Sequence, residues 1–356
     1  MGLFVRVGCS AIAGLLASCI QLDSSGVGSG FAEVATSTTA TSTSSHGPTE
    51  DPGGSTSIGA SGSTTRQDST GPEADGTDSS SGESGELEPW PTGPFGGITR
   101  VDVLNTNAND DDPSLTADML EIVFESNRSG NQDLYASSRS RVDDEWDPPQ
   151  PITELNEVST ENTPELSADG LILMFSSTRR NRPDADVFIS YRSSRNDPWE
   201  PPLEVTELNT SDEENAPTLI PTLQQIYLCS GRPSGLMGQN IWRADVTMDG
   251  AVLSFGPPEI VMDVSTDDND CSTAVSPDGL VIVFDIADDQ NTAIWEATRD
   301  SAGGVFGNAA RHDELDVDGQ SDQDPWVSPD GHVIYFSSTR PDNGEDNGQD
   351  IYLAER

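Results

Sequence analysis

One short pattern recurs five times between Ile98 and the C-terminus of this 356-residue chain. All copies align on a single position, and successive copies lie 51 to 56 residues apart. A regular period of this length is typical of proteins in which one small structural unit stacks against copies of itself. The five aligned positions are Pro113, Pro164, Pro217, Thr273 and Pro325.

Each copy contains short, alternating apolar runs that end at Gly, Pro, Asn or Asp. In three copies an Asp-Gly pair begins five positions after the aligned residue, which is a strong signal for a tight turn between strands. A fourth strand is expected at the end of each copy, at the position that Val205–Asn209 occupies in copy two. The strands expected after the turn are Ile122–Phe124, Leu173–Phe175, Ile226–Leu228, Ile282–Phe284 and Ile334–Phe336. The third strands are expected to begin at Asp133, Asp186, Asn240, Ala293 and Asp350.

Four short strands in one repeat are the content of a β-propeller blade, and blades bury their faces by stacking in a ring. The repeat region begins with a strand of the fourth type, Ile98–Leu104, whereas copy five ends after its third strand at Leu353. Pairing the first strand with the last blade would remove an exposed sheet edge. The predicted fold class is therefore all-β: a five-bladed β-propeller of four-stranded antiparallel blades, closed by its N-terminal strand.

Two copies carry a family resemblance. Ser276–Gly279 and Ser328–Gly331 both read Ser-Pro-Asp-Gly before an apolar strand, and they resemble units of TolB-like, WD-repeat-like propellers. The run from Asp186 to Thr210 is similar to units of bacterial envelope proteins. Copy three departs from the pattern, with Thr222-Leu223 in place of Asp-Gly. The resemblance spans residues 98–356, and it implies a periplasmic or surface binding module without implying a reaction.

The N-terminus has the features of a secretion signal. Arg6 precedes an apolar run, Val7–Ala17, which is too short to span a bilayer but fits a signal peptide. The run ends in Leu-Ala-Ser-Cys at Cys19, which resembles a bacterial lipobox and implies lipidation of that cysteine. An ordinary signal with a chance cysteine is the alternative. Because Ile20 and Gln21 follow, and not Asp, we expect an outer-membrane lipoprotein that faces the periplasm or the cell surface.

The segment from Ser24 to about Pro94 consists of Ser, Thr, Gly, Pro and scattered acids. It has too few large apolar residues to offset the entropy of ordering, so a disordered linker is expected. The predicted organisation is a signal peptide over 1–18, the lipidated cysteine and linker over 19–97, and the propeller over 98–356. Cys229 and Cys271 lie in the propeller, where an oxidising compartment permits a disulfide, but the sequence leaves their pairing open.

The charge of the chain restricts its partners. The formal net charge is −45, and every basic residue is Arg. Such a chain repels nucleic acid and anionic membrane surfaces. The expected partners are other envelope proteins or a small cationic or glycan ligand, with membrane contact through the lipid anchor alone. We expect a monomer.

An acidic residue precedes the aligned position by three in every copy. If the aligned strand is innermost, as in the resembling family, these acids surround one mouth of the channel and could bind a cation or a basic ligand. The alternative is that each acid accepts backbone N–H bonds in a repeated turn. Trp326, beside the fifth aligned position, could stack on a ligand in the channel. The five acids are Asp110, Glu161, Glu214, Asp270 and Asp322.

Arginines recur at the end of the second strand in four copies, where bidentate pairing to carboxylates favours a structural clamp. They are Arg128, Arg179, Arg232 and Arg340, and copy four has Asp288 at that position. One loop carries aspartates at a spacing suited to binding Ca²⁺ through oxygen, although it does not fit the EF-hand pattern. The alternative is a solvated acidic loop that binds no metal. The candidate ligands in this loop are Asp316, Asp318, Asp322 and Asp324. No other cofactor is expected.

Catalytic signals are few. The repeat region contains only His312 and His332, too few for a multi-histidine zinc site, and it has no nucleophile-elbow or phosphate-loop motif. The central carboxylates of a glycosidase would leave no sequence motif. The sequence thus predicts a membrane-anchored envelope binding or scaffold module without catalysis. The alternatives are a glycan-active five-bladed hydrolase and a calcium-stabilised surface adhesin.

Overall fold

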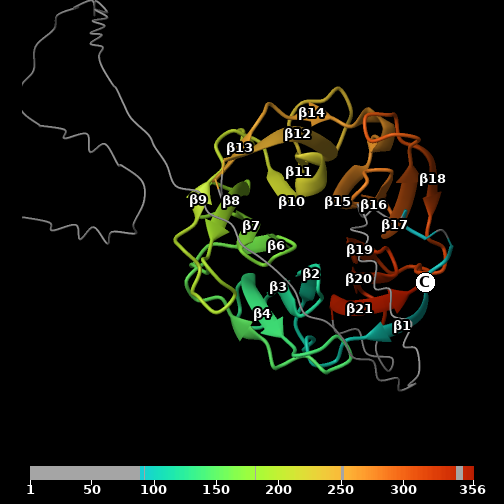
Figure 1. Ribbon diagram of the computed structural model, residues 1–356. Coiled ribbons are helices and arrows are strands. Elements are labelled where there is room, and N and C mark those ends of the chain that lie inside the picture. Colours follow the sequence, from blue (N-terminus) through green and yellow to red (C-terminus); the bar gives the residue numbers. More distant parts are fainter. Residues whose placement is uncertain (1–88, 92, 181, 250–251, 342–347) are drawn as a thin grey trace, which may run out of the picture. The chain divides into compact units, whose positions relative to one another are not determined.

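The computed structural model of the protein describes residues 89–356 except 92, 181, 250–251 and 342–347. The described residues from Trp90 onward form a ring of five antiparallel sheets around a central axis (Figure 1). The predicted signal peptide, Cys19 and most of the predicted linker lie outside the described residues. In the described part of the chain no helix is both long and apolar enough to cross a membrane.

Each sheet is one blade, and the strands follow the chain outward from the axis. Blade one contains β2 (Asp110–Leu115), β3 (Glu121–Ser126), β4 (Asp133–Ser138) and β5 (Gln150–Pro151). Blade two contains β6 (Glu161–Leu166), β7 (Ile172–Ser177), β8 (Asp186–Tyr191) and β9 (Leu203–Glu204). Blade three contains β10 (Glu214–Ile220), the 3₁₀ turn η1 (Pro221–Leu223), β11 (Gln225–Ser230) and β12 (Asn240–Asp249), with β13 (Val252–Phe255) and β14 (Glu259–Ile260) both paired to β12.

The last two blades complete the ring. The 3₁₀ turn η2 (Met262–Val264) precedes blade four, which contains β15 (Asn269–Val275), β16 (Val281–Ala287), β17 (Thr292–Thr298) and β18 (Gly307–Arg311). Blade five contains β19 (Asp322–Val327), β20 (Val333–Ser338), β21 (Asp350–Glu355) and, from the other end of the chain, β1 (Gly96–Arg100). The predicted five-bladed propeller is confirmed.

The ring closes where β1 pairs antiparallel with β21, with Thr99 opposite Leu353 (Figure 1). The closure predicted from the sequence is therefore confirmed, but the strand is shifted. It begins at Gly96 and ends at Arg100, because the chain then turns and the N–H of Leu104 donates to the carbonyl of Val101 at 3.0 Å.

The predicted strand Val205–Asn209 is wrong, because this segment forms a turn after the two-residue strand β9. The N–H of Leu208 donates to the carbonyl oxygen of Val205 at 3.0 Å. The side-chain amide of Asn209 then bonds both backbone groups of Val187 on β8, at 2.8 and 3.0 Å. The side chain of Asn209 thus makes hydrogen bonds to β8 that the backbone of an extended strand would otherwise make. Asn156 bonds Leu134 in the same way in blade one.

Apolar side chains pack into five clusters, each between two neighbouring blades. Between blades two and three, for example, Val187 packs with Leu219 and Ile226. Burial in these interfaces supplies most of the favourable free energy of folding. Each blade therefore depends on both neighbours, which explains why the repeat length is nearly constant.

Trp90 and Phe95, which the sequence assigned to the linker, are buried against the propeller. Phe95 lies just before β1, and the guanidinium of Arg356 stands 4.3 Å from its ring centroid. Three other blades have an arginine over the aromatic residue that precedes the outer strand, at 4.1 to 4.3 Å. The closing segment therefore repeats the cation–π contact of a complete blade.

Cys229 on β11 and Cys271 on β15 form a disulfide, with their Cα atoms 5.0 Å apart. This bond joins blade three to blade four. The pairing that the sequence left open is thus present in the structure.

Candidate functional site

Each of the five innermost strands has an irregularity at the same point. The register with the neighbouring strand shifts there in all five blades. The residue before the aligned position has a positive φ of 38° to 54°. These positive-φ residues are Asp112, Thr163, Ala216, Ser272 and Asp324. None is glycine, so each blade holds a residue in a conformation that its Cβ disfavours, a kind of strain that clusters at functional sites.

A pocket of about 350 Å³ occupies the central channel. The lining residues nearest the starts of the inner strands are the five positive-φ residues, which we call the floor. From there it runs along the inner strands to the turns that follow them. Its walls are mostly apolar, with Pro the most frequent residue, and Trp326 and Trp90 add aromatic surface. Trp90 is held by a 3.1 Å bond from its indole N–H to the carbonyl of Pro329.

The charged groups that line this central pocket are the carboxyl groups of Asp112, Glu165 and Asp324. Among its described lining residues there is no Arg or His. Most of the hydroxyls are already engaged: Ser114 donates to Glu165 at 3.1 Å, and Thr218 donates to the carbonyl oxygen of Thr273 at 2.8 Å. The hydroxyl of Thr273 is buried and has no hydrogen-bond partner among the described residues. The groups left for a ligand are therefore mainly carboxyl oxygens.

Glu165 has unusual acid–base properties. Burial raises its pKa to about 8, although hydrogen bonds from Ser114 and from the backbone of Leu219 favour the charged form. Near neutral pH its carboxyl group therefore carries a proton that it can donate.

A second group of acids adjoins the floor. Asp111, Asp112, Glu125, Asp285 and Asp324, here called the acidic cluster, come from blades one, four and five. Burial, reinforced by the neighbouring carboxylates, raises the pKa values of Asp111 and Asp112 well above the usual range. Burial also raises the pKa of Glu125 to about 7 and that of Asp285 to about 8. In the described part of the chain none of the five forms an ion pair with Arg or His.

Sequence reasoning missed most of the acidic cluster, although a signal was present. Glu125 and Asp285 follow the apolar runs Ile122–Phe124 and Ile282–Phe284 directly. The matching residues of the other blades, Ser176, Cys229 and Ser337, are uncharged. A buried carboxylate at a strand position that other copies leave neutral indicates a local role and not a requirement of the blade.

The structure places the five acids predicted at a channel mouth at the starts of the inner strands, outside the central pocket. All are buried, and each accepts a backbone N–H from the turn that precedes its own inner strand. Glu161, for example, accepts the N–H of Glu157 at 2.8 Å and the hydroxyl of Ser177 at 2.9 Å. This geometry matches the interpretation in which each acid accepts backbone N–H bonds in a turn that recurs in every copy. The five are Asp110, Glu161, Glu214, Asp270 and Asp322.

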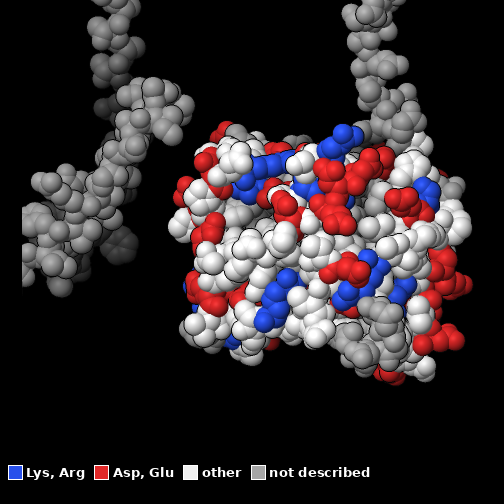
Figure 2. Space-filling view, turned by 90° about the horizontal axis from the view of Figure 1, so that it is seen from below, with Lys and Arg blue, Asp and Glu red and all other residues white. Residues whose placement is uncertain are grey.

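The clamp role predicted for the recurring arginines is confirmed in four blades. Arg232 lies 3.2 Å from Glu214 and Arg340 lies 2.5 Å from Asp322, and Arg128 and Arg179 make the equivalent pairs. Blade four has no such arginine, and burial raises the pKa of Asp270 to about 6. Among the described residues visible in Figure 2, arginines lie beside carboxylates and do not gather into one basic patch.

The loop predicted to bind Ca²⁺ does not bring its four carboxylates together. Asp316 pairs with Arg311, and Asp322 pairs with Arg340. Asp318 is exposed, whereas Asp324 lies at the floor of the pocket. Trp326 does line the channel, as its place beside an inner strand suggested.

No family model and no curated protein matches the sequence. Similar solved structures include TolB from Acinetobacter baumannii, at 15% identity and a TM-score of 0.40, where the match covers 71% of this chain and 56% of TolB. Another is the α-L-arabinofuranosidase of Podospora anserina in complex with cellotriose, at 13% identity and a TM-score of 0.47, covering 70% of this chain and 90% of the enzyme.

A third similar structure is a family 117 glycoside hydrolase of the marine bacterium Zobellia galactanivorans, at 15% identity and a TM-score of 0.47, covering 74% of this chain and 90% of the enzyme. These similarities concern the fold alone, which hosts both binding proteins and enzymes. The β-propeller that the repeats resemble is confirmed by the arrangement of the five sheets.

Proposed function

We propose that the protein is a binding module of the cell envelope, whose central pocket takes a ligand with a positively charged group joined to an apolar body. The ligand is a small amine or a basic side chain of a partner protein. The observation that carries this proposal is the composition of the pocket: apolar walls, two tryptophans, three carboxyl groups and no basic side chain among its described residues.

Several features of the pocket and of the chain favour a cation. Neither Asp112 nor Asp324 has an ion-pair partner among the described residues, and an ammonium or guanidinium group would supply charge-assisted hydrogen bonds to both. Trp90 and Trp326 also line the pocket, and the faces of aromatic rings attract cations. The net charge of −45 also steers cations toward the protein. The volume of about 350 Å³ falls at the small end of ligand pockets.

The test compares a cationic probe with a neutral one of the same shape. Benzylamine should bind at least about tenfold more tightly than benzyl alcohol, because a hydrogen bond to a charged group contributes about 1.5–3 kcal/mol. Titration calorimetry measures both affinities in metal-free buffer. Asp324→Asn should remove the preference, whereas Asp313→Asn, at an exposed acid outside the pocket, should keep it. Equal affinity of the two probes for the wild-type protein would overturn the proposal.

The envelope location is part of the proposal and depends on the lipobox-like sequence at Cys19. A lipidated Cys19 would hold the propeller at the outer membrane through the Ser- and Thr-rich segment. Radiolabelled palmitate should label the wild-type protein in a bacterial host, and Cys19→Ser should abolish labelling and move the protein to the soluble fraction. Membrane retention of the unlabelled variant would contradict this location.

A second candidate function is glycan hydrolysis, which the state of Glu165 favours. A carboxyl group with a pKa of about 8 can act as general acid, and Asp112 and Asp324 in the same pocket can supply the second carboxylate. Aryl glycosides test this candidate. Turnover that falls by about 100-fold or more in Glu165→Gln would support hydrolysis. Binding of benzylamine without turnover of any glycoside would leave the binding module as the function.

A further inference from the structure

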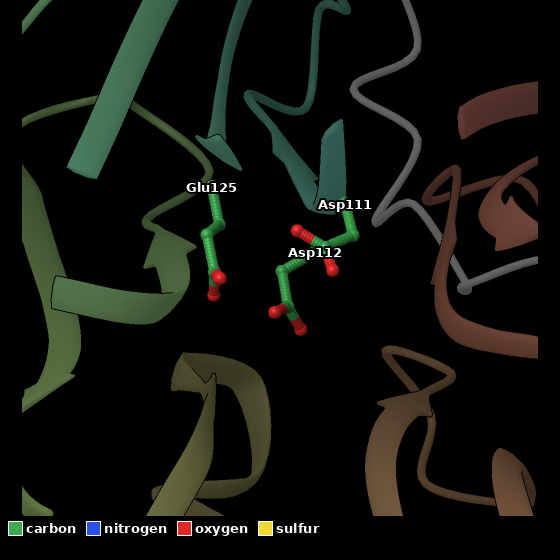
Figure 3. A group of neighbouring side chains, drawn as sticks. All are labelled: Asp111, Asp112 and Glu125. Atoms are coloured by element: carbon green, nitrogen blue, oxygen red, sulfur yellow. The ribbon is translucent and has the colours of Figure 1, made fainter. Parts of the chain in front are cut away.

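We infer that Asp111, Asp112 and Glu125 form a calcium site at the floor of the central pocket. One oxygen from each of the three lies within 4.8 Å of the others, and the side chains gather around one small space (Figure 3). Calcium binds oxygen at about 2.3–2.6 Å, so ligands on opposite sides of one ion stand about 4.6–5.2 Å apart. The three oxygens therefore fit within the ligand shell of a single ion.

An independent observation points to a missing ligand. Oδ1 of Asp111 is buried from solvent and has no hydrogen-bond partner among the described residues. The whole residue is only 6% exposed. A buried carboxylate oxygen normally accepts at least one hydrogen bond, and leaving it without one is costly. A cation beside this oxygen supplies the interaction that the protein does not.

The surroundings add further carboxyl groups that form no ion pair with Arg or His among the described residues. Asp324 adjoins Asp112 through a side-chain hydrogen bond, and its own N–H donates to Asp285 at 3.0 Å. Carboxyl groups packed this closely must either share protons or surround a cation. A divalent ion bound here would offset two of the negative charges of the acidic cluster.

The donor set selects the class of metal. All three proposed ligands offer oxygen, and the sulfur atoms of the two described cysteines, Cys229 and Cys271, are bonded to each other in the disulfide. Oxygen-only sites suit hard cations, whereas zinc and copper prefer imidazole or thiolate. Calcium tolerates irregular geometry, which suits ligands drawn from two strands of one blade.

The site has a route to solvent. Asp112 belongs both to the proposed metal site and to the floor of the central pocket, so an ion can reach the site through the pocket. This inference does not depend on the proposed binding of a cationic ligand. It predicts that the full-length protein binds calcium without any organic ligand present.

The experiment is calcium titration of the full-length protein after treatment with a chelator. Calorimetry should show one saturable site with a Kd below about 1 mM, the weak end for extracellular calcium modules. Calcium should raise the melting temperature, and excess EGTA should reverse the shift. Terbium, a luminescent substitute for calcium, should be sensitised by Trp326 in the same pocket and displaced by calcium.

Isosteric variants locate the site. Asp111→Asn and Glu125→Gln should each weaken calcium binding at least about tenfold, with melting temperatures in EGTA no lower than that of the wild type, because they remove repulsion between buried charges. Asp318→Asn, at the exposed loop acid, is the matched control and should bind like the wild type. No saturable binding up to about 10 mM calcium would overturn the inference. Loss of binding in Asp318→Asn with retention in both other variants would also overturn it.

Discussion

Nη2 of Arg179 lies 3.3 Å from Oε1 of Glu161, and this pair joins the end of the second strand of blade two to the start of its first. The same guanidinium donates to the carbonyl of Leu155 at 2.7 Å and stands 5.0 Å from the ring centroid of Phe175. Because three other blades repeat the ion pair, the recurring acids and arginines form the structural frame of the blade. Function is then expected where the blades differ.

Arg179→Met should lower the free energy of unfolding by about 3–5 kcal/mol, because it leaves the carboxylate of Glu161 buried without its partner. Urea denaturation followed by circular dichroism measures the change. The control is Asp118→Asn, which weakens a more exposed ion pair to Arg195 and should cost less than about 1 kcal/mol. Equal losses in the two variants would show that the blade clamp is not structural.

Removing the disulfide should destabilise the propeller. The bond closes a loop with a sequence separation of 42 residues, for which the chain-entropy relation gives a loss of about 4 kcal/mol. Cys229→Ser with Cys271→Ser should therefore melt earlier than the wild type and should no longer respond to reductant. Two free thiols in the unreduced wild-type protein would contradict the pairing.

The closing segment should be essential for stability. Phe95 is 3% exposed and contacts Arg356 and His312, so Phe95→Ala should cost about 3–5 kcal/mol in equilibrium unfolding. Val305→Ala, at a residue that is 73% exposed, is the control and should change stability little. A small effect of Phe95→Ala would mean that the ring does not depend on this closure.

His312 should make stability depend on pH. Burial disfavours the charged imidazole, but hydrogen bonds and charges from Glu296 and Glu314 outweigh it and raise the pKa of His312 above its ordinary 6.5. The folded state therefore binds the proton more tightly than the unfolded state. This contribution is fully present below about pH 6.5 and is lost as the pH rises through the folded pKa.

Denaturation at several pH values tests this dependence in wild type and His312→Gln. The difference in free energy of unfolding between the two proteins isolates the histidine from the other titrating acids, and it should shrink as the pH rises above 6.5. Arg356, which also bonds Glu296 at 3.0 Å, is unchanged in the variant. A difference that is constant across this range would contradict the assignment.

The propeller could be predicted from the sequence because one unit is repeated, and repetition exposes strand order, period and closure together. The acidic cluster was missed because its members come from three blades and occupy three different positions of the repeat, none of which is acidic in all five copies. Asp111 and Asp285 are far apart in the chain, and each comes close to Asp324 only when blades one, four and five surround the channel. Trp90 was missed because it lies in a Pro- and Gly-rich stretch whose composition indicates a linker.

The central claim, that the channel pocket binds a cationic group, is tested most directly by a crystal structure of the protein with benzylamine. We expect the ammonium nitrogen within about 4 Å of a carboxylate oxygen of Asp112 or Asp324. The aromatic body should pack against the apolar walls beside Trp326. Benzylamine bound outside the channel, with none in the pocket, would contradict the claim.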